Sequence, residues 1–205
     1  MSKGNMFNLS PVASLVFDAS ALINIASSGI CAEFIAALGR NCLVEEIAWR
    51  EITGHIEKYR LNENIKKAVS CGQLDIVDMS QSEAAMYISL VSAPHPNTLD
   101  DGEAATIALA HNREAIAVID EKKGGRIAGE LVPPLNVLST LDLFKMIEDG
   151  CQSNGLCINT ALFKSLTKAR MRVPFEHEDW VFQCLTGEQV KQCVCLPKRL
   201  RERAF

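Results

Sequence analysis

Acidic residues flank a predicted helix and a predicted strand within residues 99–126, LDDGEAATIALAHNREAIAVIDEKKGGR. Asp101 and Glu103 stand at the start of an alanine-rich run typical of a buried helix, and Asp120 follows a short apolar run. In a parallel sheet, an acid at the carboxyl end of a strand faces the crevice where ligands bind. Each acid also has an ordinary structural alternative as a helix cap or a turn residue, and Asp100 is assigned to capping.

Two further acids stand in similar positions earlier in the chain. Asp18 ends the apolar run 14–17 and directly precedes a helical stretch, in the order strand, acid, helix. Glu51 lies one turn inside a second predicted helix, beside the apolar Ile47 and Ile52. Helix capping for Asp18 and a solvated helix surface for Glu51 remain the structural alternatives.

Four acids from separate segments are therefore expected to converge: Asp18, Glu51, Glu103 and Asp120. Carboxylates held close together repel one another, so such a cluster usually holds protons or a divalent cation. Mg²⁺ and Mn²⁺ prefer hard oxygen ligands and suit this histidine-poor set better than zinc does. Such ions activate a water molecule and stabilise the charge on a phosphodiester during an in-line displacement.

The elements that must position these acids alternate along the chain. Short apolar runs predict strands at 14–17, 42–44, 74–77, 115–119 and 135–138. The segments between them have helical spacing, and one apolar helix is expected over 21–38. This order predicts an α/β fold with a central parallel sheet flanked by helices. Because only helices are predicted after residue 140, we expect one domain at 1–140 and a helical C-terminal extension at 141–205.

Composition bounds the class of protein. The 205 residues are 48% apolar and 22% charged, as in an ordinary globular protein with one substantial core. No apolar run approaches the length of about 20 residues that spans a bilayer, and the N-terminus lacks a signal-peptide core, so a cytoplasmic protein without membrane contact is expected. The net charge of −4 argues against a protein that coats nucleic acid. Residues 164–205 nevertheless hold nine Lys or Arg against five Asp or Glu.

Two groups of basic residues are candidates for contact with a phosphate backbone. The segment KKGGR is predicted to form a turn beside the acids, where such a backbone would pass. Its basic residues are Lys122, Lys123 and Arg126. Lys164, Lys168 and Arg172 recur at four-residue spacing and are expected to line one helix face. A solvated surface is the usual meaning of such a row, and phosphate contact is the alternative.

The segments around the four acids resemble the signature blocks of PIN-domain nucleases. The blocks are FDASALINI, EEIAWREI, LDDGEAATIALA and VIDEKKGGRIA. The resemblance covers about residues 15–138 and is strongest to the bacterial and archaeal branch, whose third block carries Gly-Glu. It implies a central parallel sheet wrapped by helices and Mg²⁺- or Mn²⁺-dependent cleavage of RNA. It also implies a toxin role in many members, with an antitoxin protein as partner, and a possible homodimer.

Carried over to this chain, the resemblance places the catalytic acids at Asp18, Glu51, Glu103 and Asp120. Asp18, Glu103 and Asp120 would bind the metal, and Ser20 would be the accompanying hydroxyl. Asp101 could take the role of Glu103 instead, and Glu121 could share the role of Asp120. The double glycine Gly124-Gly125 and the long helical C-terminus depart from the family pattern. The alternative function is a catalytically inactive PIN-like module that binds RNA or a protein partner.

Overall fold

The structure, a computed structural model, describes residues 13–59, 63–150 and 155–203. Within these ranges five strands form one sheet in the order β3-β2-β1-β4-β5, and every pairing is parallel. The strands are β1 (Leu15–Phe17), β2 (Cys42–Glu45), β3 (Asp75–Val77), β4 (Ile116–Val118) and β5 (Val137–Leu138). Each overlaps an apolar run that predicted it, and the predicted α/β fold with a central parallel sheet is confirmed.

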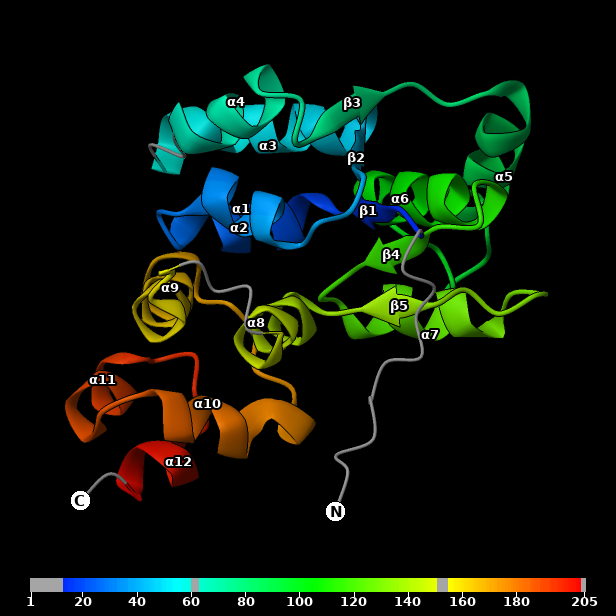
Figure 1. Cartoon of the computed structure of the whole chain (residues 1–205). Coiled ribbons are helices and arrows are strands. Elements are labelled where there is room, and N and C mark those ends of the chain that lie inside the picture. Colours follow the sequence, from blue (N-terminus) through cyan, green and yellow to red (C-terminus); the bar gives the residue numbers. More distant parts are fainter. Residues whose placement is uncertain (1–12, 60–62, 151–154, 204–205) are drawn as a thin grey trace, which may run out of the picture.

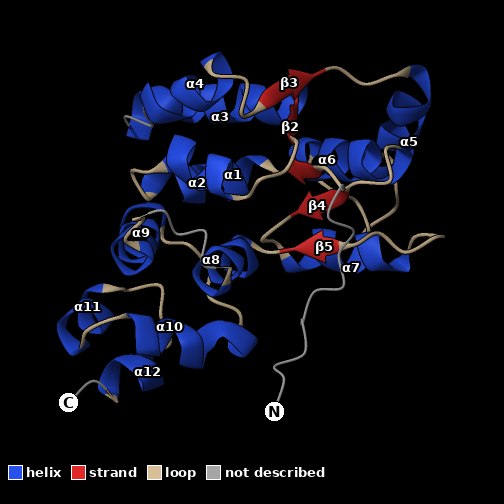
Figure 2. Ribbon diagram, viewed as in Figure 1, coloured by secondary structure: helices blue, strands red, loops and turns tan. Residues whose placement is uncertain are grey.

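Strand β1 lies at the centre of the sheet, between β2 and β4, as labelled in Figure 1 and drawn in red without a label in Figure 2. The chain runs outward from β1 to β2 and β3, and later from β4 to β5, so the strand order reverses between β1 and β4. In open parallel sheets, ligands bind outside the carboxyl ends of the strands at such a reversal. Asp18 directly follows β1 and Asp120 comes two residues after β4, so both acids stand at this edge.

Helices cover both faces of the sheet (Figure 1). Side chains alternate across a strand, so Leu15 and Phe17 join one hydrophobic core and Val16 joins the other. The first core is covered by α1 (Ala19–Ser27), α2 (Cys31–Ala37), α3 (Glu46–Tyr59) and α4 (Glu63–Ser70). The second is covered by α5 (Gln81–Val91), α6 (Asp101–Asn112) and α7 (Lys122–Glu130). The alanine-rich run of α6 is buried throughout 102–110, as its composition predicts.

The C-terminal helices extend the first core. They are α8 (Thr140–Asp149), α9 (Ile158–Lys164), the π-helical η1 (Ser165–Ala169), the 3₁₀-helical η2 (Phe175–His177), α10 (Glu178–Cys184), α11 (Gly187–Gln192) and α12 (Lys198–Glu202). Leu162, Leu166 and Leu200 are buried in the same core as Phe17 of β1. The domain boundary at residue 140 stays a prediction.

The single helix predicted over 21–38 is wrong. The chain forms α1 and α2 instead, and Gly29 separates them with a left-handed φ of +82° that a continuous helix does not contain. No single described helix is long and apolar enough to cross a membrane. The pair α1 and α2 meets those criteria only when the two are joined, and they are bent by 113° at the break.

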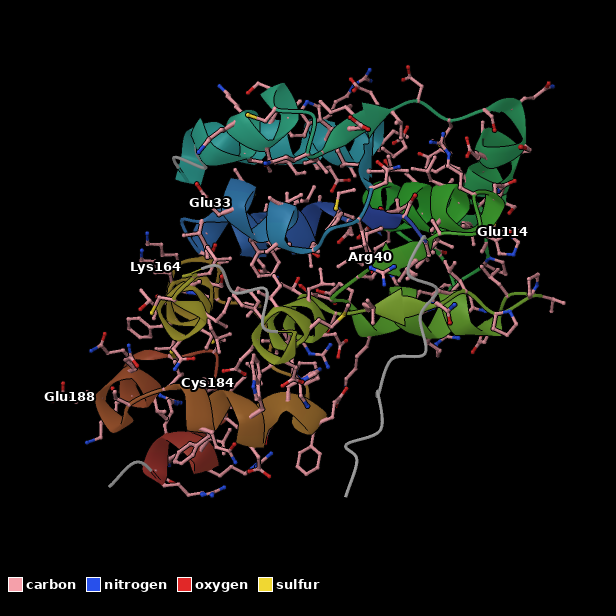
Figure 3. All side chains as sticks on the ribbon, viewed as in Figure 1. Glu33, Arg40, Glu114, Lys164, Cys184 and Glu188 are labelled. Atoms are coloured by element: carbon pink, nitrogen blue, oxygen red, sulfur yellow. The ribbon has the colours of Figure 1, made fainter. Side chains whose placement is uncertain are left out.

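The basic row after residue 163 does not lie on one helix face as predicted. Lys164, labelled in Figure 3, ends α9, and the chain continues as the π-helix η1, which contains Lys168. A four-residue repeat stays close to one face while the helix lasts, but the helix ends at Ala169, before the repeat reaches Arg172. Arg170, with a φ of +55°, ends η1, and Arg172 follows outside any helix.

Candidate active site

Asp18 combines a capping role with a place at the end of β1. Its buried side chain, 4% exposed, accepts hydrogen bonds from the backbone N–H and the hydroxyl of Ser20 at the start of α1. Burial raises the pKa of Asp18 to about 6, against the opposing effect of the Ser20 hydrogen bonds and with the help of the negative charge of Asp100. Asp18 therefore caps α1, and the hydroxyl of Ser20, which the resemblance assigns to the site, contacts its carboxylate.

Glu103 lies in the first turn of α6 and is almost completely buried, at 3% exposure. Its Oε1 atom has no hydrogen-bond partner among the described residues. Burial raises the pKa of Glu103 to about 7, with contributions from the charges of Asp100 and Asp18 and an opposing one from Lys123. A buried carboxylate oxygen without a partner is costly to keep, so this atom stands where a cation would be favourable.

Two glycines allow the acids to approach closely. A Cβ atom on Gly102 would lie 2.8 and 2.9 Å from the two carboxylate oxygens of Glu51. A Cβ atom on Gly124 would lie 2.8 Å from Oε1 of Glu103. The Gly-Glu pair at the start of α6 therefore gives Glu51 room to reach this helix, and Gly124 brings α7 against Glu103. The double glycine that departs from the family pattern thus has a steric reason at its first member.

The acid cluster, defined here as Asp18, Glu51, Asp100 and Glu103, gathers around the N-terminus of α6. The backbone N–H of Gly102 acts to lower the pKa of Glu51, but other effects outweigh it. Burial raises its pKa, and so do the nearby charges of Asp18 and Asp100. The side chain of Asp100 accepts a hydrogen bond from the backbone N–H of Glu103 at 2.9 Å, which confirms its capping role. Its charge also acts on all three other acids.

The two alternative acids lie at the border of the acid cluster. Asp101 accepts a hydrogen bond from the hydroxyl of Tyr87 at 2.8 Å and contributes weakly to the raised pKa of Glu51. Glu121 is exposed at the N-cap position of α7 and contributes weakly to the raised pKa of Glu103. Both are close enough to act electrostatically on the acid cluster, and neither is buried in it.

Asp120 has different surroundings from the acid cluster. Its carboxylate accepts hydrogen bonds from the amide of Asn24 at 2.6 Å and from the backbone N–H and hydroxyl of Thr140 at 2.7 and 2.6 Å. These donors are uncharged and belong to α1 and to the start of α8. As the side chains stand, no group of three or more His, Cys, Asp or Glu in the described ranges has a metal-holding arrangement. Three of the four predicted acids therefore converge, and the fourth is tied to neighbouring elements.

Comparison with protein families decides the class of this arrangement. A family model described as a PIN domain (DUF3368) matches residues 14–173. The chain belongs to this PIN-domain family. PIN domains are generally nucleases, and thus hydrolases, and typically use divalent metal ions. Comparisons with curated proteins and with solved structures find no match.

The chemistry of the PIN-domain acids fits a divalent ion. All donors are carboxylate oxygens, which Mg²⁺ and Mn²⁺ prefer. The unpartnered Oε1 of Glu103 offers a buried acceptor, and the raised pKa values of Asp18 and Glu103 show that their negative charges lack compensation. Asp120 has the least capacity left, because three of the roughly four acceptor positions of a carboxylate are already used.

The basic segment of this PIN domain forms the first turns of α7, so the prediction that KKGGR is a turn is wrong. Gly125 N–H bonds to the Glu121 carbonyl and closes the first helical turn, because glycine does not prevent a helix at its N-terminus. Lys122 and Lys123 are exposed, and the charge of Lys123 reaches Glu103. Arg126 instead pairs with Glu130 at 2.9 Å and donates to Asn97.

Sequence reasoning missed three polar contacts of the PIN-domain site. Asn24 and Thr140 hold Asp120, and Arg172 donates to the Asp120 backbone oxygen at 3.3 Å. An asparagine in the mostly apolar helix α1 was the available signal, since a buried amide needs a partner. Thr140 and Arg172 carried no such local signal, because only the fold brings them to the end of β4.

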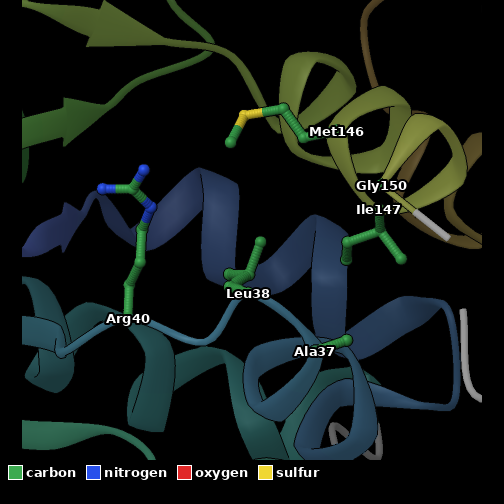
Figure 4. Close-up of a pocket in the computed structure, with 6 residues that line it drawn as sticks. All are labelled: Ala37, Leu38, Arg40, Met146, Ile147 and Gly150. Atoms are coloured by element: carbon green, nitrogen blue, oxygen red, sulfur yellow. The ribbon is translucent and has the colours of Figure 1, made fainter. Parts of the chain in front are cut away.

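A separate hollow of about 190 Å³ lies between α2 and α8 (Figure 4). Its lining residues are Ala37, Leu38, Arg40, Met146, Ile147 and Gly150. None of these residues carries a carboxylate. None of them belongs to the acid cluster or donates a hydrogen bond to the Asp120 carboxylate. This hollow therefore lends no support to metal chemistry.

Proposed function

We propose that this PIN domain is a divalent-metal-dependent endoribonuclease that hydrolyses RNA phosphodiester bonds with Mg²⁺ or Mn²⁺. The observation that carries the proposal is the unpartnered, buried Oε1 of Glu103 inside the acid cluster. Burial, together with neighbouring like charges, raises the pKa values of Asp18 and Glu103 and favours binding of a cation there. Their place at the strand reversal favours an extended ligand crossing the sheet edge.

Each acid has its own part in the proposed reaction. Asp18 and Glu103 would hold the ion, with Asp120 as the further ligand that the resemblance implies. When bound, the ion supplies an activated water and a counter-charge for the phosphodiester. Glu51 is the most exposed of the three converging predicted acids, and its pKa is raised, so it is suited to take up a proton and pass it to solvent.

The basic start of α7 supports an anionic substrate. Lys122 and Lys123 are exposed beside the acid cluster, and the uncapped N-terminal N–H groups of α7 add partial positive charge. Phosphate contacts of this kind position a nucleic acid without reading its sequence. We therefore propose Lys122 and Lys123 as backbone contacts, whereas Arg126 is already engaged by Glu130.

A cleavage assay tests the proposal. Labelled single-stranded RNA and DNA of the same sequence are incubated with the protein in Mg²⁺, in Mn²⁺ or in a chelator. We expect metal-dependent RNA cleavage that is lost in Asp18→Asn and kept in Asp149→Asn, a matched loss of one exposed charge at the end of α8. Cleavage by Asp18→Asn at the native rate, or equal cleavage in chelator, would contradict the proposal.

A thermal shift separates the nuclease from an inactive PIN-like module. An ion that binds only the folded state raises the melting temperature. We expect Mn²⁺ to stabilise the wild type and not Asp18→Asn, whereas a module without a metal site gives the same small shift in both. The toxin role, an antitoxin partner and a homodimer stay predictions from the resemblance.

A further inference from the structure

The segment after η1 brings a cation to the carboxyl end of β4. Nη1 of Arg172 donates a hydrogen bond to the backbone oxygen of Asp120 at 3.3 Å. Met171 and Val173 on either side are buried in the hydrophobic core, with exposures of 1% and 9%. Arg172 between them is only partly buried, and its guanidinium reaches the end of β4.

Asn24 of α1 holds this segment in place. The hydroxyl of Ser165 in η1 donates to the backbone oxygen of Asn24 at 2.7 Å, and this contact is buried. The side-chain amide of Asn24 donates to the Asp120 carboxylate at 2.6 Å. One residue therefore contacts both η1 and the fourth predicted acid, and the left-handed Arg170 turns the chain between them.

The positive charge of Arg172 is not taken up by an acid. The Asp120 carboxylate is satisfied by the uncharged donors of Asn24 and Thr140. Across the described ranges, no carboxylate forms an ion pair with Arg172. A guanidinium group has five N–H donors in a planar fork that matches a phosphate, and the contact with the Asp120 carbonyl uses one of them.

We propose that Arg172 binds a phosphate of the RNA backbone beside Asp120, so that residues beyond 140 complete the substrate site. The proposal rests on the proposed nuclease function and adds a contact that the family's acidic residues do not provide. A half-buried guanidinium binds an anion more strongly than an exposed lysine does, because charge-assisted hydrogen bonds gain from partial exclusion of water. Arg172 would hold the strand next to the carboxylates, while Lys122 and Lys123 contact it from α7.

Metal-free RNA binding tests this contact directly. The affinity for a labelled single-stranded RNA is measured in chelator over a range of salt concentrations. Each lost phosphate contact on a single strand lowers the slope of log K against log salt by about 0.7. We expect this loss, with binding weakened about tenfold at low salt, in Arg172→Ala and in Arg172→Gln, and the wild-type slope in Arg172→Lys. Lys66→Ala, which removes an exposed charge on α4, should keep the wild-type slope.

The variants also separate phosphate binding from a structural role. Gln retains an N–H donor for the Asp120 carbonyl but has no charge, whereas Lys retains the charge. A wild-type slope in Arg172→Gln would therefore overturn the inference, and the melting temperature of each variant shows whether it folds. If Arg172→Ala does not fold, the Gln and Lys pair still decides the question.

Cleavage provides the second readout. With Mn²⁺, Arg172→Ala is expected to raise KM and to lower kcat/KM by about tenfold or more. An unchanged kcat/KM would overturn the inference. Absence of cleavage in the wild type would overturn the proposed nuclease function. A smaller dependence of RNA affinity on salt in metal-free Arg172→Ala would then still support the phosphate contact. The two failures are thus distinguishable.

Discussion

Two regions at the same edge of the sheet satisfy their carboxylates in opposite ways. The acid cluster near the start of α6 leaves Oε1 of Glu103 unpartnered and surrounds it with like charges. At the end of β4, Asp120 accepts three hydrogen bonds from uncharged donors of α1 and α8. The first region has negative charge without compensation, and the second has a carboxylate that joins three elements. Residues of one signature motif set can therefore differ in how much they contribute to chemistry and to the fold.

Removal of a charge from the acid cluster should have the largest effect on activity. Loss of a residue that hydrogen-bonds to a metal ligand typically reduces metal affinity or activity about 10- to 100-fold. Loss of a proposed ligand itself, in Glu103→Gln, should therefore reduce cleavage by more than about a hundredfold. The rate of RNA cleavage in Mn²⁺ measures this. Glu188→Gln, which removes an exposed charge on α11, is the control and should cleave normally. Similar rates in the two variants would remove Glu103 from the site.

Asp120→Asn should have its largest effect on stability. The amide NH₂ of the new side chain would face the donors of Asn24 and Thr140, so at least one partly buried hydrogen bond is lost. We expect the free energy of unfolding to fall by about 2 kcal/mol in metal-free buffer, measured by urea denaturation. Asp18→Asn should instead stay stable or become more stable at pH 8, because asparagine is an equally good helix cap and carries no buried charge. Equal destabilisation by both would remove the contrast between the regions.

The two adjacent glycines of α7 offer a matched pair of variants. Gly124→Ala places a Cβ atom 2.8 Å from Oε1 of Glu103, whereas a Cβ atom on Gly125 meets nothing within 4 Å. We expect Gly125→Ala to stabilise the protein by up to about 1 kcal/mol through helix propensity. Gly124→Ala should lose that gain and should weaken Mn²⁺-dependent stabilisation, measured by thermal shift. Identical behaviour of the two would show that Glu103 has room to move.

A further difference between the two regions concerns the pH dependence of metal-free stability. The folded-state pKa values of Asp18 and Glu103, about 6 and about 7, lie above their ordinary values of 3.8 and 4.5. The folded state therefore binds more protons than the unfolded state in this interval, and these groups make stability fall as the pH rises from about 4 to about 7.

The melting temperatures of the wild type and of Asp18→Asn, compared in chelator at several pH values, isolate this contribution. The melting temperature of Asp18→Asn should increase relative to that of the wild type as the pH rises toward 7. A constant difference would show that the Asp18 carboxyl titrates normally. Mn²⁺ should reverse the trend for the wild type, because deprotonated carboxylates bind it more strongly.

Much of the architecture was predictable from local patterns. Apolar runs marked all five strands of the described sheet, and the alternation of strands and helices indicated a parallel sheet. The acids Asp18, Glu51 and Glu103 were predictable as neighbours, because their order and spacing resemble those of PIN-domain nucleases. Helix ends were less accurate. Gly29 broke a predicted helix, and the left-handed Arg170 ended the next one before Arg172, since both depend on backbone conformations that residue spacing does not report.

The local order of apolar and acidic residues thus sets which strands form and which acids follow them, since strand propensity and capping act over a few neighbouring residues. The partners of those acids depend on contacts between residues far apart in the chain. Asn24 and Thr140 reach Asp120 across 96 and 20 positions, and Arg172 reaches it across 52. Burial, which raises the pKa values of Asp18 and Glu103, likewise arises only when α6, α7 and β1 pack together. Packing therefore decides which carboxylates are buried beside like charges and which one is held by uncharged donors from other elements.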